Sequence, residues 1–194
     1  MKMNIFALPK INSSLSNIMN SNNEYINFLL SKNNIFHYLK TKNYFQIFNL
    51  PQNYHINKEK LNKTYKLLQF HFHPDKSKQK DSIECSSLIS TAYKTLSDDI
   101  SRIKYILKIN NIQNKNNNKI DLVKLFKIQE NIENSTDIML MKIKADTLNK
   151  IKKYRENIGE EYDKKNYGKI NEIIDKINYS NSIINHINKV NKKI

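Results

Sequence analysis

The chain has 194 residues, of which 39% are hydrophobic, so it can form one ordinary domain or two small ones with a buried core. Two glycines and three prolines leave little material for β-hairpins and exclude a glycine-rich phosphate loop, so the composition predicts an all-α fold. The formal net charge is +15, but lysine supplies nearly all of it amid equally heavy use of Asn and Ile, which is typical of a low-GC genome. We interpret most of this charge as solvated helix faces.

Three further features of the composition limit the class of protein. Cys85 is the only cysteine, which excludes an intrachain disulfide and a zinc site built from several thiolates. No apolar run approaches the roughly 18 residues that a membrane span needs, so no membrane partner is expected. Arginine, the preferred reader of bases, occurs only at Arg102 and Arg155. We therefore expect no nucleic-acid partner, and a basic helical nucleic-acid binder is the less favoured alternative.

Residues 1–42 differ from the rest in composition. Ser and Asn are frequent, Glu24 is the only acid, and the cations include Lys2, Lys10, Lys32 and Lys40. A basic, Ser-containing segment that is poor in acids is typical of an organellar transit segment, and an Asn-rich disordered leader is the alternative. We therefore predict a targeting or disordered leader over residues 1–42.

The first predicted helices follow the leader. A short helix runs from Asn43 to Leu50, where Pro51 closes it. Asn57 is a suitable N-cap for a longer helix that ends at about Phe72. Its apolar stripe consists of Leu61, Tyr65, Leu68 and Phe72, and Lys60, Lys63 and Lys66 lie away from this stripe. One face of the helix is therefore expected to pack and the other to be charged.

A second long helix follows the polar loop 76–81. Its apolar stripe consists of Leu88, Ile89, Ala92, Tyr93 and Leu96. Two such helices joined by a short loop pack as an antiparallel hairpin. A short helix at about Arg102 to Leu107 completes a first domain over residues 43–109, and an Asn-rich linker follows over 110–119.

Residues 120–194 are predicted to form a three-helix bundle. The helical patterns cover Ile120 to Ile132, about Asp137 to Tyr162, and Gly168 to about Lys192, and none could bury its apolar stripe alone. The stripe of the middle helix consists of Leu148, Ile151, Tyr154, Ile158 and Tyr162, and that of the last of Ile170, Ile173, Ile174, Ile177, Ile184 and Ile187. We place the tight turn between these two helices at Asn166 to Gly168.

The tripeptide His73-Pro74-Asp75 ends the longer helix of the first domain. A proline cannot continue a helix, so His73 and Asp75 are expected on an exposed turn. On its own the tripeptide indicates only an ordinary helix-ending turn. A metal shared by His71, His73 and Asp75 is disfavoured, because residues two apart on a helix point in different directions, and no metal ligand is predicted.

The surroundings of this turn resemble the J-domain co-chaperones, and among them the HscB (Jac-type) branch that serves iron–sulfur cluster assembly. The segment NYFQIFNLP at 43–51 resembles that branch's opening YFxLFxLP, and LISTAYKTL at 88–96 resembles its INxAYxTL helix. Arg102 with the segment YIL at 105–107 resembles its RAxYLL segment. The resemblance covers about Asn43 to Val190 and departs from the family at Asp98-Asp99, where a Pro-containing turn is usual.

The resemblance implies that residues 43–109 are a J-domain. Its His73, Pro74 and Asp75 would dock on the ATPase domain of a DnaK-type chaperone of the heat-shock 70 class. Lys63 and Lys66 would face an acidic chaperone surface, the alternative being a merely solvated helix face. The chain would then activate its partner's ATPase, would not itself be an enzyme, and would need no cofactor.

The resemblance also implies a client. Residues 120–194 would be an HscB oligomerisation-type domain that binds the iron–sulfur cluster scaffold protein, with the mitochondrial matrix as the location. The family's scaffold-binding surface matches Leu122, Val123, Phe126 and Tyr179, and the alternative is that these apolar residues belong to the core. A general J-domain co-chaperone for other clients is the alternative function.

Overall fold

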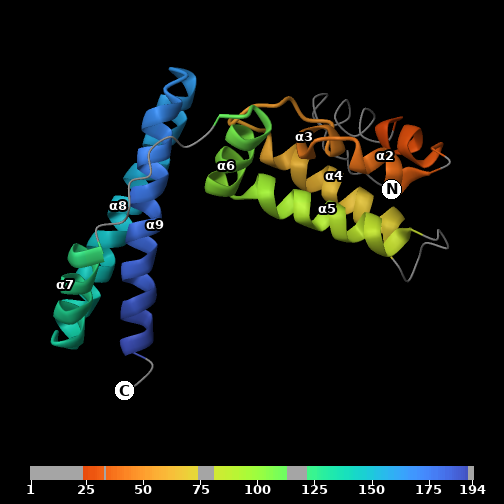
Figure 1. The fold of residues 1–194 in the computed structure, drawn as a ribbon. Helices are drawn as coiled ribbons and strands as arrows, with labels where there is room; N and C mark the ends of the chain where they lie inside the picture. The colour runs from red at the N-terminus through yellow and green to blue at the C-terminus, as the bar shows by residue number, and fades with distance from the viewer. Residues whose placement is uncertain (1–23, 33, 74–80, 113–121, 192–194) are drawn as a thin grey trace, which may run out of the picture. The chain divides into compact units, whose positions relative to one another are not determined.

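The structure is a computed structural model that describes residues 24–32, 34–73, 81–112 and 122–191. Within these ranges every regular element is a helix, so the all-α prediction is confirmed. The chain divides into two compact units, Met1–Asp98 and Asp99–Ile194, whose helices are labelled in Figure 1. None of the described helices has the length and apolar character that crossing a membrane requires.

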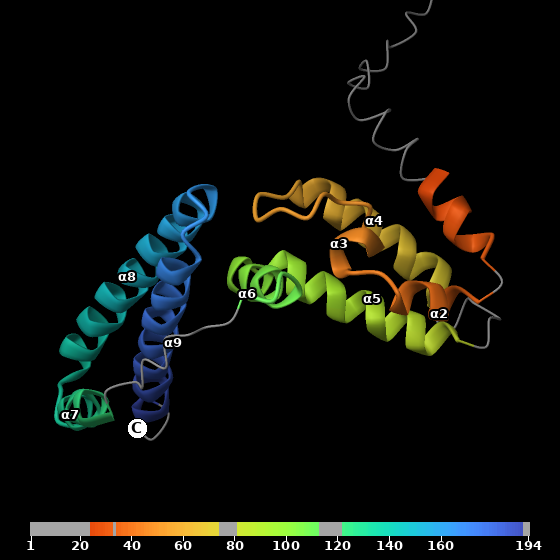
Figure 2. The same ribbon diagram turned by 45° about the horizontal axis from the view of Figure 1, so that its top comes forward.

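The first unit is built around a helical hairpin. A helical segment at 24–30 comes first, followed by α2 (Ile35–Lys40), α3 (Tyr44–Ile47), α4 (Lys58–Phe72) and α5 (Ser82–Ser97). Helices α4 and α5 lie side by side, and α2 and α3 both pack on α5 (Figure 2). The largest fully buried side chains include Phe45, Phe48, Leu61, Leu68, Phe72, Ile89 and Leu96.

Local sequence explains where α4 begins and ends. The Asn57 side chain accepts a hydrogen bond from the Lys60 amide (2.9 Å), as an N-cap should. Phe72 is the last helical residue, and His73 has an extended backbone (φ −66°, ψ 130°), which a residue before proline prefers. The predicted start and end of this helix are therefore confirmed.

Residues 24–40 differ from the leader prediction. They form two helical segments with Ile26, Leu29, Ile35 and Leu39 buried to 5% exposure or less. The Tyr25 hydroxyl donates to the carbonyl oxygens of Gln46 (2.7 Å) and Ile47 (3.1 Å), which anchors the segment to α3. These residues are part of the folded unit because their apolar side chains recur at helical spacing, which the Asn-rich composition obscures. Residues 1–23 lie outside the described part.

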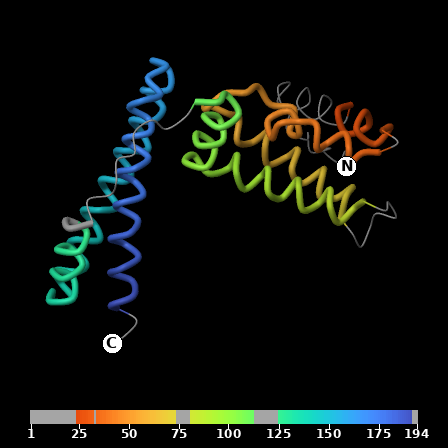
Figure 3. The backbone as a smooth tube through the Cα atoms, viewed as in Figure 1, coloured from red at the N-terminus to blue at the C-terminus, as the bar shows by residue number. Residues whose placement is uncertain are grey.

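The second unit contains α6 (Asp99–Ile109), α7 (Leu122–Glu133), α8 (Asp137–Asp163) and α9 (Tyr167–Val190). Helices α8 and α9 form a long hairpin, and α7 packs against α9 (Figure 3). A core cluster of Ile132, Leu140, Ile183 and Ile187 joins α7, α8 and α9, which confirms the three-helix bundle. The sequence analysis assigned α6 to the first domain, whereas the boundary between the compact units falls just before it.

The turn between α8 and α9 lies earlier than predicted and does not use glycine. Lys165 has the left-handed conformation (φ 57°), and its amide donates to the Tyr162 carbonyl (2.9 Å). The Asn166 amide donates to the Glu161 carbonyl (2.9 Å), which completes a Schellman ending. Gly168 is already the second residue of α9, so the prediction of a turn at Asn166 to Gly168 is wrong.

Asparagine takes the place of glycine at two other helix ends. Asn49 after α3 (φ 51°) and Asn111 after α6 (φ 55°) are both left-handed. The residue after each donates back to the helix, Leu50 to the Phe45 carbonyl and Ile112 to the Leu107 carbonyl, both at 2.9 Å. Asparagine tolerates this conformation better than most residues, which explains how a chain with two glycines ends its helices.

One predicted core residue of α8 is not in the core. Leu148 is 49% exposed, whereas its neighbour Thr147 is 7% exposed and Ile151 is 8% exposed. The buried face of α8 therefore passes through Thr147, and Leu148 lies beside it.

Candidate partner-binding surfaces

His73 marks the end of α4 and has an exposed side chain. Phe72, directly before it, is 0% exposed, so the last turn of α4 is anchored in the core of the first unit. Pro74 and Asp75, the other residues of the predicted chaperone-binding turn, lie outside the described residues. The described part thus places one of the three predicted residues, on the surface at the helix end.

The predicted lysines lie on the outward face of α4. Lys63 forms an ion pair with Glu59 one turn earlier (Nζ to Oε1, 2.8 Å), and its side chain is 33% exposed. Lys66 is exposed. A surface pair of this kind contributes only about 0.3–0.5 kcal/mol and leaves both groups accessible to a partner. Glu59 therefore balances part of the charge of Lys63, while Lys66 lies further along towards His73.

A glutamine connects α4 to α5 close to His73. The Gln69 Nε2 donates to the Ser86 carbonyl oxygen (3.2 Å) and to the Ser90 Oγ (2.9 Å). Its Oε1 accepts a hydrogen bond from the Ser86 Oγ (2.9 Å). Helical periodicity does not reveal these bonds. The feature of the sequence that could indicate them is the pair of serines four residues apart on the packing side of α5.

A second polar contact joins the two helices further from His73. The Tyr93 hydroxyl donates to the Asn62 Oδ1 (2.8 Å). The Tyr93 ring also stacks on Tyr65, with 3.9 Å between ring centroids. The hairpin is therefore held at two levels along its length as well as by its apolar core.

The predicted scaffold-binding residues of the second unit have different environments. Phe126 on α7 is 72% exposed, so the core alternative does not hold for it. Tyr179 on α9 is half-buried and packs against the core cluster that joins α7, α8 and α9. Leu122 and Val123 belong to the first turn of α7, and their side chains lie outside the described part.

Helix α8 carries exposed apolar side chains that the sequence analysis did not assign. Ile138 is 82% exposed, Met139 is 52% exposed and Met141 is 70% exposed. Ile138 and Met141 are one helical turn apart and so share a side of the helix. Periodicity alone missed them because the predicted stripe of this helix began at Leu148.

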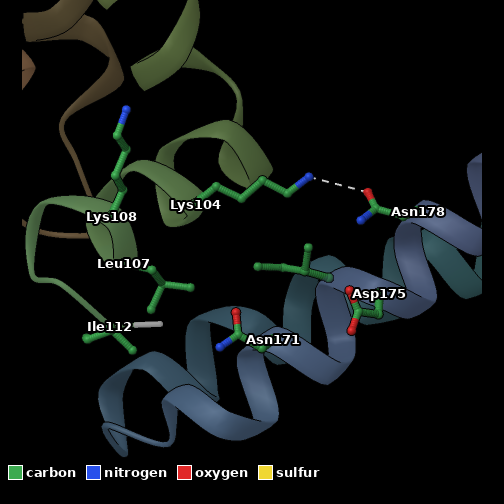
Figure 4. A pocket seen from close by; sticks show the side chains of 8 residues that line it. Lys104, Leu107, Lys108, Ile112, Asn171, Asp175 and Asn178 are labelled. Atoms are coloured by element: carbon green, nitrogen blue, oxygen red, sulfur yellow. Dashed lines mark hydrogen bonds between the residues drawn. The ribbon is translucent and has the colours of Figure 1, made fainter. Parts of the chain in front are cut away.

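The second unit also contains a cavity of about 310 Å³ between α6 and α9 (Figure 4). Its lining combines apolar side chains, among them Leu107 and Ile174, with Lys104, Lys108 and Asp175. The Lys104 Nζ donates to the Asn178 Oδ1 (3.3 Å) across this cavity. None of the predicted site residues lines it.

Burial shifts the pKa of two groups in the first unit. It raises the pKa of the Cys85 thiol to about 11, with smaller contributions from the carboxylates of Asp81 and Glu84. It also raises the pKa of the Tyr25 hydroxyl, with a smaller contribution from Tyr38. A thiol with a raised pKa is protonated near neutral pH and is a weak nucleophile. Both groups are therefore structural and belong to neither surface.

The DnaJ domain family matches residues 43–105, a range that includes the whole of α4 and the tripeptide His73-Pro74-Asp75. The chain is 31% identical over 151 residues to "Co-chaperone protein HscB" of Buchnera aphidicola subsp. Acyrthosiphon pisum (strain Tuc7), covering 70% of this chain and 87% of that protein. It is 28% identical over 154 residues to "Iron-sulfur cluster co-chaperone protein HscB" of Mus musculus, covering 73% of this chain and 66% of that protein.

Two solved structures are similar in fold. The crystal structure of the human co-chaperone protein HscB has a TM-score of 0.66 at 26% identity, covering 79% of this chain and 83% of that one. Chaperone HscB from Vibrio cholerae has a TM-score of 0.65 at 20% identity, covering 78% of this chain and 99% of that one. Both likenesses extend well beyond the range of the DnaJ domain.

Proposed function

Since the chain belongs to the HscB family of J-domain co-chaperones, we propose that it stimulates ATP hydrolysis by a DnaK-type chaperone and delivers an iron–sulfur scaffold protein to it. The main support for stimulation of the chaperone is the end of α4, where buried Phe72 anchors exposed His73 directly before Pro74. The name of the mouse relative, an iron–sulfur cluster co-chaperone, and the exposed Phe126 support the delivery of a scaffold protein.

In this proposal the chain binds the chaperone, and the chaperone hydrolyses ATP. Asp75 supplies a carboxylate that can pair with a chaperone arginine through charge-assisted hydrogen bonds. Pro74 restricts the backbone of the turn, so that little conformational entropy is lost on binding. The chain accelerates hydrolysis by favouring one conformation of the chaperone, because a bound partner shifts an equilibrium by its differential affinity for the two states.

The lysine face of α4 serves association in this proposal. Lys66 and Lys63 carry positive charge about two and three turns before His73 on α4. An acidic chaperone surface would attract them over a distance comparable with the Debye length. The ion pair with Glu59 orients Lys63 and leaves Lys66 as the more accessible cation. These charges would raise the association rate more than the affinity.

The scaffold-binding surface is proposed around Phe126 on α7. A large aromatic side chain that is 72% exposed is a typical anchor of a protein interface. Leu122 lies one turn earlier on the same helix and would extend the surface. Tyr179, which packs against the core, would support this surface from α9.

We also propose a location in the mitochondrial matrix. The support is the composition of residues 1–23, which include lysine and several serines and no acidic residue. Residues 24–32 and 34–40 belong to the folded first unit, so the targeting function is assigned to residues 1–23 alone. Imaging of a fluorescent protein fused to residues 1–23 tests this assignment, and a diffuse cytosolic signal would reject it.

A paired substitution at the end of α4 tests the chaperone part of the proposal. His73→Gln should abolish stimulation of the chaperone's steady-state ATPase, because His73 is exposed at the binding turn. His71→Gln is the matched control, since His71 is half-buried two residues earlier and contacts the Phe70 ring edge-on. Circular dichroism should show both variants folded. Full stimulation by His73→Gln would reject the proposed role of the turn.

A further inference from the structure

We propose that Gln69 is a positioning residue for His73 at the end of α4. Its side-chain amide holds the last turn of α4 against α5 and so sets the direction in which α4 presents His73. This inference rests on the proposed function, because it assigns Gln69 a part in how His73 is held for the chaperone.

The amide of Gln69 is bonded through all of its polar groups. The Nε2 group donates one hydrogen bond to the Ser86 carbonyl oxygen (3.2 Å) and one to the Ser90 Oγ (2.9 Å). The Oε1 accepts from the Ser86 hydroxyl (2.9 Å). Exchanging the nitrogen and oxygen would place Oε1 against the Ser86 carbonyl oxygen, two acceptors facing each other. The amide therefore has one favourable orientation.

The position of Gln69 connects this orientation to the binding turn. Gln69 lies four residues before His73, so the two side chains are one turn apart on nearly the same side of α4. The buried stripe of α4, which ends at Phe72, sets which face of the helix packs on α5. The directional hydrogen bonds from Gln69 to two residues of α5 narrow the rotation of the last turn further.

The second polar contact of the hairpin supplies a matched control. The Tyr93 hydroxyl bonds to the Asn62 Oδ1 (2.8 Å), which also joins α4 to α5. Asn62 lies about 10 Å further from His73 along the helix than Gln69 does, at 1.5 Å per residue. Losing either contact should weaken the hairpin, but only the loss of the Gln69 bonds should misdirect His73.

The experiment uses the full chain with the substitutions Gln69→Leu and Tyr93→Phe. The measured quantities are the concentration for half-maximal stimulation of a DnaK-type chaperone's ATPase, the maximal stimulation and the melting temperature. Gln69→Leu should raise the half-maximal concentration roughly fivefold to tenfold, with the maximal stimulation retained. Tyr93→Phe should lower the melting temperature by a smaller amount, because it removes one exposed hydrogen bond, and should leave the half-maximal concentration unchanged.

Substitutions of the serine partners separate positioning from folding. Ser86→Ala combined with Ser90→Ala should reproduce the effect of Gln69→Leu without changing α4. Ser86→Thr combined with Ser90→Thr keeps both hydroxyls and should retain the half-maximal concentration of the unsubstituted chain. If Gln69→Leu does not fold, the positioning role is tested by comparing the half-maximal concentrations of the two serine double variants. The role requires a higher value for the alanine variant than for the threonine variant.

The outcomes distinguish this inference from the function on which it rests. If His73→Gln is inactive while Gln69→Leu and the serine-to-alanine variant stimulate at the normal concentration, the positioning role is wrong and the proposed function stands. The role is equally wrong if the half-maximal concentration follows the melting temperature in every variant, Tyr93→Phe included. If His73→Gln stimulates as well as the unsubstituted chain, the proposed function fails and the positioning role fails with it.

Discussion

Cys85 is the residue whose chemistry is most clearly set by burial. It is 0% exposed on α5, and a thiolate there would lose its hydration and face the carboxylates of Asp81 and Glu84. The fold therefore keeps the proton on the sulfur. Cys85 is a packing residue, which agrees with its being the only cysteine in the sequence.

This burial predicts an alkaline loss of stability. Because folding raises the pKa of the Cys85 thiol from about 9 to about 11, its contribution is fully present below pH 9 and is lost as the pH rises towards 11. The free energy of urea unfolding should fall between pH 8 and pH 10.5, with on the order of 2 kcal/mol due to this thiol. Cys85→Ala should be less stable at pH 8 and should show a smaller alkaline loss. An equal loss in both proteins would contradict the assignment, since lysine deprotonation affects both alike.

Residues of the candidate site differ in how far the sequence predicts them. The end of α4 before Pro74 follows from the covalent geometry of proline, so the exposed position of His73 is predictable. Gln69 is not, because its partners are 17 and 21 residues away and periodicity says nothing about contacts between helices. Helical spacing does not decide between a surface and a core position for Phe126, because it does not tell which neighbour covers a side chain.

At the scale of elements, the helices before α3 extend the first unit. The region of the DnaJ match begins at residue 43, yet Leu29 and Leu39 upstream of it are both 0% exposed. The Tyr25 hydroxyl donates to the carbonyl oxygens of Gln46 and Ile47 at the end of α3, which ties the extension to that helix. The extension is therefore expected to stabilise the first unit.

A core substitution in α2 measures that contribution. Leu39→Ala should lower the free energy of unfolding by about 2–5 kcal/mol, because it removes a fully buried side chain and leaves a cavity. His37→Ala, exposed on the same helix, should change it by less than about 0.5 kcal/mol. Chemical unfolding followed by circular dichroism gives both values. If the two variants unfold alike, the extension is not a cooperative part of the first unit.

Helix boundaries show what a single sequence reveals about elements. The start of α4 follows from Asn57, a residue whose side chain can bond the free amides of a first turn. The apolar pattern predicts the end of α8 at about Tyr162, one residue from its observed end at Asp163. The turn after it is predicted too late because glycine favours a left-handed turn, whereas Lys165 adopts that conformation. Hydrogen bonds from the next residue to the helix make such an ending favourable, and these bonds depend on the geometry of the whole turn.

At the scale of the whole molecule, the net charge of +15 raises the question of which lysines act on a partner. Lysines occur in both units, but in the proposed function the chaperone's acidic surface attracts those on α4. Charge near a binding surface steers association, whereas charge further from that surface than a Debye length of about 8–10 Å is screened.

Two lysine substitutions distinguish local steering from overall charge. Lys66→Ala should lower the association rate with the chaperone and make it less dependent on salt, because it removes a cation about two turns from His73. Lys152→Ala removes the same charge from an exposed position on α8 and should leave the rate unchanged. Stopped-flow association at 50 and 200 mM salt, ionic strengths across which screening changes substantially, would measure both. Equal effects of the two variants would show that only net charge matters.

The measurement that tests the account most directly is single-turnover ATP hydrolysis by a DnaK-type chaperone, with the full chain and an iron–sulfur scaffold protein added in turn. The account predicts that the chain accelerates hydrolysis and that the scaffold accelerates it further. Phe126→Ala should raise the scaffold concentration needed for this second effect while leaving the first intact, because Phe126 and His73 belong to different units. A hydrolysis rate that the unsubstituted chain does not change would contradict the account.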